Sequence, residues 1–66
     1  MATMRPAEFR RIRKKLGYTQ QRLADKVGAH RVTITNWERG ALDIPRSIAV
    51  LMRLANERGS IPNGDK

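Results

Sequence analysis

The side chains best suited to chemistry lie in one short segment, residues 30–39, and their types suit recognition better than catalysis. Arg31 can donate two hydrogen bonds to O6 and N7 of guanine, and Asn36 can pair in the same two-point manner with N6 and N7 of adenine. Val32 and Thr35 carry methyl groups that can contact the methyl group of thymine. The segment therefore favours contact with base edges of a nucleic acid, the alternative being an ordinary solvated helix surface.

The charge balance points to the same class of partner. The chain has 66 residues, with 14 Lys and Arg against 6 Asp and Glu, a net charge of +8 and a pI near 11.4. Such a balance favours a polyanion, either nucleic acid or an anionic membrane. The longest apolar run, residues 48–52, is far shorter than the roughly 20 residues that span a bilayer, and no signal peptide is recognisable. We expect a soluble, cytoplasmic, nucleoid-associated protein.

Catalysis and metal binding find little support in the sequence. There is no cysteine and a single histidine, His30, so neither a disulfide nor a thiolate or histidine metal site is expected. Ser47, Ser60 and Asp25 fall in separate segments, and neither serine lies in a nucleophile motif. The glycines are scattered and form no phosphate-binding loop. We expect no enzyme, no cofactor and no small-molecule ligand.

Apolar residues spaced three and four apart place the recognition segment in the third of four short helices. These helices are expected at residues 6–16, 19–27, 30–39 and 45–58. Gly17, Gly28 and Gly40 follow the first three, as glycine often does at a helix C-terminus. The fold class is therefore all-α, a compact bundle of four or five short helices. Its parts are an N-terminal arm (1–5), a helical domain (6–58) and a flexible C-terminal tail (59–66).

The second and third helices are joined by a short turn that contains Gly28, the arrangement of a helix-turn-helix motif. Ala24 has little bulk and lets these two helices approach closely. Ile34 and Trp37 lie three residues apart and are expected to hold the third helix against the core. With these two side chains inward, the helical period turns Arg31 and its neighbours outward.

The stretch 17–40 resembles the lambda-repressor and Cro-like family of helix-turn-helix domains, also called the xenobiotic-response-element family. The matching pieces are Gly17-Tyr18-Thr19-Gln20, Leu23-Ala24-Asp25-Lys26-Val27-Gly28 and Thr33-Ile34-Thr35-Asn36-Trp37-Glu38-Arg39-Gly40, with Phe9-Arg10-Arg11-Ile12-Arg13 upstream. The resemblance covers roughly residues 6–56. It implies a transcriptional regulator that binds double-stranded DNA.

The resemblance also implies roles for individual residues. Base edges would be contacted by Arg31, Val32 and Asn36, with Thr35 beside them. Backbone phosphates would be contacted by Gln20, His30, Thr33, Arg39 and Arg46, and Gln20 would also brace the third helix. Arg13 and Glu38 would form an ion pair between the first and third helices. Arg22 is added on physical grounds, because a positive charge in the first turn of a helix opposes the helix dipole unless it faces an anion.

Two features leave alternatives open. Leu42, Ile44, Val50 and Leu54 are expected to form a self-complementary patch for a homodimer, although single exposed apolar residues are common. The basic run at residues 10–15 is expected to be mainly a solvated helix surface, the alternative being long-range attraction to DNA.

The expected function is that of an autoregulating repressor on a palindromic operator. One alternative is a DNA-binding antitoxin or interaction subunit that acts through a protein partner. Another is binding of RNA or membrane through charge alone, but the chain lacks both an exposed aromatic series for stacking and a wide apolar helix face.

Overall fold

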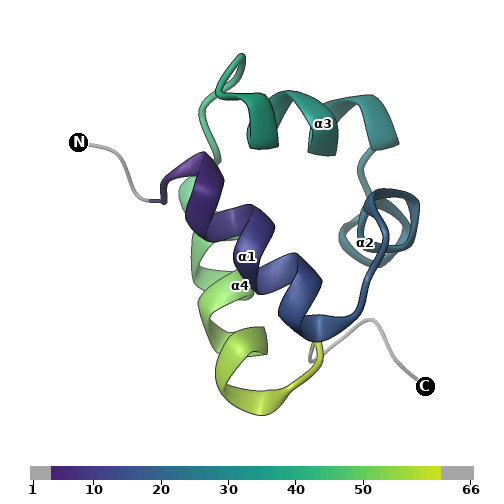
Figure 1. Ribbon diagram of the computed structural model, residues 1–66, viewed down its shortest axis with the longest axis vertical. Coiled ribbons are helices and arrows are strands. Elements are labelled where there is room, and N and C mark those ends of the chain that lie inside the picture. Colours follow the sequence, from purple (N-terminus) through teal and green to yellow (C-terminus); the bar gives the residue numbers. More distant parts are fainter. Residues whose placement is uncertain (1–3, 62–66) are drawn as a thin grey trace.

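Four helices follow one another along residues 4–61, the part of the chain that the computed structural model describes (Figure 1). They are α1 (Pro6–Leu16), α2 (Gln20–Val27), α3 (Arg31–Arg39) and α4 (Arg46–Arg58). The predicted all-α fold is confirmed, and these residues contain no strand. Helices α2, α3 and α4 begin one residue later than predicted, because Thr19, His30 and Pro45 have extended backbone angles and precede the first turn.

The first helix packs against two of the other three. Helix α1 packs against α4 along one side and against α3 on another, while α2 packs against α3. In Figure 1, α1 lies in front of α4, α3 crosses above them, and α2 is seen end-on beside α3. The consequence is that α3 is held from below by α1 and from the side by α2, with its remaining side facing outward.

All four helices contribute side chains to one hydrophobic core. Its buried apolar residues are Met4, Phe9, Ile12, Leu23, Ala24, Ile34, Trp37, Ile44, Ala49, Met52, Ala55 and Ile61. The rings of Phe9 and Trp37 meet edge to face, with centroids 5.8 Å apart and an interplanar angle of 71°. Such a pair adds about 0.5–1.5 kcal/mol beyond its buried area, so it ties α1 firmly to the inner side of α3.

The core extends further at both ends than the sequence predicts. Met4, placed in the N-terminal arm, and Ile61, placed in the flexible tail, are both buried in the core. The backbone N–H of Ile61 also donates a long hydrogen bond of 3.5 Å to the hydroxyl of Tyr18. A small domain has little apolar surface to spare, so these flanking residues cover the core. The rest of the predicted arm and tail, residues 1–3 and 62–66, lies outside the described residues.

Gly28, in the turn between α2 and α3, has a φ of +76°. In this left-handed conformation a side chain with a Cβ is strained, although a Cβ there would meet no atom within 4 Å beyond the neighbouring residues. We therefore expect Gly28→Ala to lower the free energy of unfolding by about 1 kcal/mol, as measured by urea denaturation. Gly28→Asn, which tolerates this conformation better, should lose less. Equal stability of Gly28→Ala and the wild type would contradict the prediction.

Candidate nucleic-acid interface

The outer side of α3 carries the residues that the sequence predicts as base contacts. Ile34 and Trp37 are buried, so the opposite side of the helix faces solvent. Arg31 and Val32 are exposed, with Val32 at 60% of its full exposure, and Thr35 and Asn36 are half-buried. The structure thus brings the four predicted residues onto one surface with two hydrogen-bonding groups and two sets of methyl groups.

A polar network holds this surface in place from behind. Arg13 of α1 donates from Nε to Oε2 of Glu38 on α3 at 2.5 Å and from Nη2 to Oε1 at 3.2 Å. Both side chains are nearly buried, at 10% and 6% exposure. The structure therefore contains the ion pair that the family resemblance implies. Arg13 Nη1 also donates to the backbone carbonyl of Tyr18 at 2.8 Å, so one guanidinium fixes α3 and the segment leading into α2.

Gln20 extends this network from α2 to the outer side of α3. Its Nε2 donates to Glu38 Oε1 at 3.1 Å, and its Oε1 lies 3.1 Å from the hydroxyl of Thr35. The same hydroxyl lies 3.1 Å from the carbonyl oxygen of Arg31. Gln20 therefore braces α3, as predicted. Its contact with Thr35 joins two residues that share no sequence pattern, and only the packing of α2 on α3 reveals it.

The N-terminus of α2 lies beside the recognition surface. Thr19 caps this helix, because its Oγ1 accepts a hydrogen bond from the backbone N–H of Arg22 at 3.0 Å. The side chain of Arg22 is exposed. His30 precedes α3 without a side-chain capping bond, as expected for a histidine at this position. Both side chains are exposed, Arg22 in the first turn of α2 and His30 directly before α3.

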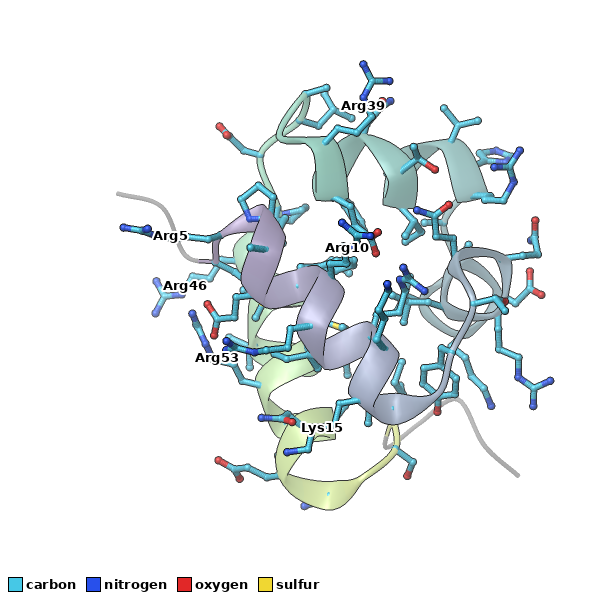
Figure 2. The ribbon with its side chains drawn as sticks, in the orientation of Figure 1. Arg5, Arg10, Lys15, Arg39, Arg46 and Arg53 are labelled. Atoms are coloured by element: carbon cyan, nitrogen blue, oxygen red, sulfur yellow. The ribbon has the colours of Figure 1, made fainter. Side chains whose placement is uncertain are left out.

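The other predicted phosphate contacts lie further along the molecule. Thr33 is half-buried, whereas Arg39 and Arg46 are exposed. Figure 2 shows Arg39 at the C-terminal end of α3 and Arg46 on the side where α1 and α4 begin. Of the predicted phosphate contacts, His30 thus precedes the first turn of α3, Arg39 lies in its last turn, and Gln20 and Arg22 lie in the first turn of α2.

The predicted dimer patch needs one correction. Leu42, Val50 and Leu54 are exposed, as expected, with Val50 at 55%. Ile44 is only 6% exposed and belongs to the hydrophobic core, so its prediction as a dimer contact is wrong. The loop between α3 and α4 covers the core, and Ile44 is the side chain of this loop that packs into the core.

Within residues 4–61, no group of three or more His, Cys, Asp and Glu side chains could hold a metal ion. None of the helices in this range is both long and apolar enough to cross a membrane.

The fold and the outer side of α3 together define a helix-turn-helix DNA-binding domain. The family model described as helix-turn-helix matches residues 9–57, well over half of the chain. The chain therefore belongs to the helix-turn-helix family, of the Cro/CI-like type. No curated protein and no solved structure gives a significant match. Family membership makes the protein a DNA-binding regulator.

Proposed function

We propose that this protein is a repressor that binds a palindromic operator as a homodimer, with α3 in the major groove. The observation that carries the proposal is the construction of α3. Its inner side is buried through Ile34 and Trp37, its edge is fixed by Glu38, and its outer side is left exposed. A rigid helix with Arg31 and Asn36 outward is suited to reading base edges, because the major groove is wide enough to admit one helix.

In this proposal Arg31, Val32, Thr35 and Asn36 contact bases. Gln20, Arg22, His30, Thr33, Arg39 and Arg46 contact phosphates. The logarithm of the association constant falls by about 0.9 per phosphate neutralised for each tenfold rise in salt. Binding is therefore strongly salt-dependent. A repressor of this kind would act in the cytoplasm, at the nucleoid, by blocking polymerase at its operator.

A binding selection on random duplexes tests the proposal directly. The protein should enrich a two-fold symmetric sequence whose half-sites are centred about 34 Å apart, one turn of the double helix. Enrichment of an asymmetric site would argue against the homodimer, and a partner protein would then have to complete the complex. Failure to bind any duplex at low salt would contradict the proposal as a whole.

The homodimer is proposed to form through Leu42, Val50 and Leu54. We expect Val50→Glu to dissociate the dimer, since the new charge would be buried against a second copy. The monomer should stay folded, because surface substitutions usually change stability by less than about 0.5 kcal/mol. Sedimentation velocity measures the first effect and thermal denaturation the second. Ser47→Glu is the matched control, an exposed site on the same helix with the same change in charge. A Val50→Glu protein that remains dimeric would place the interface elsewhere.

A further inference from the structure

Two adjoining depressions lie between α1 and α3, with volumes of about 560 and 290 Å³. Both are lined by Arg10, Lys14 and Glu38. Figure 2 shows Arg10 projecting from α1 into the space below α3. The smaller depression is also lined by Gln20, Thr35 and Arg39, among others. We refer to the two depressions together as the α1–α3 groove.

The one acidic side chain in the α1–α3 groove is already neutralised. Both carboxylate oxygens of Glu38 accept hydrogen bonds from Arg13, and one of them also accepts from Gln20. Arg10, Lys14 and Arg39 make no side-chain ion pair with any other residue in the range 4–61. With Arg11, which lines the larger depression, the groove therefore gathers four cations, while its one carboxylate is already paired with Arg13. This arrangement suits an anionic ligand.

The α1–α3 groove runs along the edge of the base-reading surface. Thr35 of the proposed base contacts forms part of its wall, as does Gln20 at the start of α2. A helix lying in the major groove has a sugar-phosphate backbone on each side, because the groove is only about 12 Å wide. The backbone on the α1 side of α3 would then pass over the α1–α3 groove.

From this juxtaposition we infer that the α1–α3 groove seats backbone phosphates, and that Arg10 and Lys14 of α1 are phosphate-binding residues. The inference rests on the proposed docking of α3 in the major groove and adds α1 to the DNA-binding surface. From the sequence alone, the basic run at residues 10–15 is expected to be mainly a solvated helix surface. The sequence does not show which of its cations face α3.

Single substitutions that remove one positive charge each test the inference. The test variants are Arg10→Gln and Lys14→Gln. Lys15→Gln is the matched control, because Lys15 is exposed on the same helix, lies in the same last turn as Lys14, and lines neither depression. Figure 2 shows Lys15 at the end of α1 remote from α3. Fluorescence anisotropy would measure the affinity of each protein for the selected operator and for a scrambled duplex, between about 50 and about 200 mM salt.

Each test variant should bind both duplexes about three- to tenfold more weakly at low salt. The slope of the logarithm of the association constant against the logarithm of the salt concentration should become shallower by about 0.9. Lys15→Gln should keep the wild-type slope. Equal losses for all three variants would show an effect of net charge alone and would overturn the inference, as would an unchanged slope for Arg10→Gln and Lys14→Gln. In either case the proposed function would stand, provided that the wild type still selects its operator. A wild type that binds no duplex would overturn both.

Discussion

Glu38→Ala should lower the free energy of unfolding by about 3 kcal/mol, because it leaves the buried guanidinium of Arg13 without its counter-ion. Arg13 is 10% exposed and Glu38 6%, and the two share two hydrogen bonds. An unpaired buried charge costs far more than the same charge at the surface. In a chain of 66 residues this loss is a large share of the total stability. Urea denaturation followed by far-ultraviolet circular dichroism measures it.

Two further variants separate the charge from the packing. Glu38→Gln keeps the shape of the side chain and an acceptor for Arg13, so its loss should be smaller than that of Glu38→Ala. The double variant Arg13→Met with Glu38→Leu removes both charges and should be more stable than Glu38→Ala alone, since replacing a whole buried ion pair by apolar groups is often close to neutral. The prediction is wrong if the double variant loses as much free energy of unfolding as Arg13→Met and Glu38→Leu lose when their separate effects are added.

The recognition surface could be predicted from the sequence because it depends on a local period. Once Ile34 and Trp37 are assigned to the core, the geometry of an α-helix turns Val32 directly outward and leaves Arg31 at the edge of the exposed side. The structure confirms this arrangement. The pairing of Arg13 with Glu38 is different in kind. These residues lie on separate helices, so their contact depends on how α1 packs on α3, and only the family resemblance supplied it.

The errors fall on apolar residues outside the regular helices. Met4, Ile44 and Ile61 stand in short non-helical segments, where no period indicates which side faces the core. Each is buried because the four helices leave a gap that a neighbouring side chain must fill. The α1–α3 groove escaped prediction for a related reason. The distinction between Lys14, which lines it, and Lys15, which does not, arises only when α3 packs across α1.

Arg31→Ala is expected to have the largest effect on sequence recognition. Arg31 is exposed in the first turn of α3, beside Val32 on the solvent-facing surface. If its guanidinium pairs with a guanine, its loss should remove about 1–3 kcal/mol of discrimination at one base position. Binding to a scrambled duplex should fall much less, since only one positive charge is lost there. Titrations on the selected operator, on operators with each base substituted in turn, and on the scrambled duplex would locate that position.

Arg31→Lys distinguishes base reading from charge. Lysine keeps the positive charge and the salt dependence, but it lacks the planar guanidinium that makes two parallel hydrogen bonds. The specificity of the Arg31→Lys protein should therefore fall towards that of Arg31→Ala, while its affinity for the scrambled duplex is retained. Gln20→Ala serves as the opposite control. Gln20 contacts Glu38 and Thr35 rather than the exposed end of Arg31, and its loss should weaken all duplexes alike. Equal losses of Arg31→Ala on specific and scrambled DNA would remove Arg31 from the base-reading surface and leave Asn36 as its main hydrogen-bonding group.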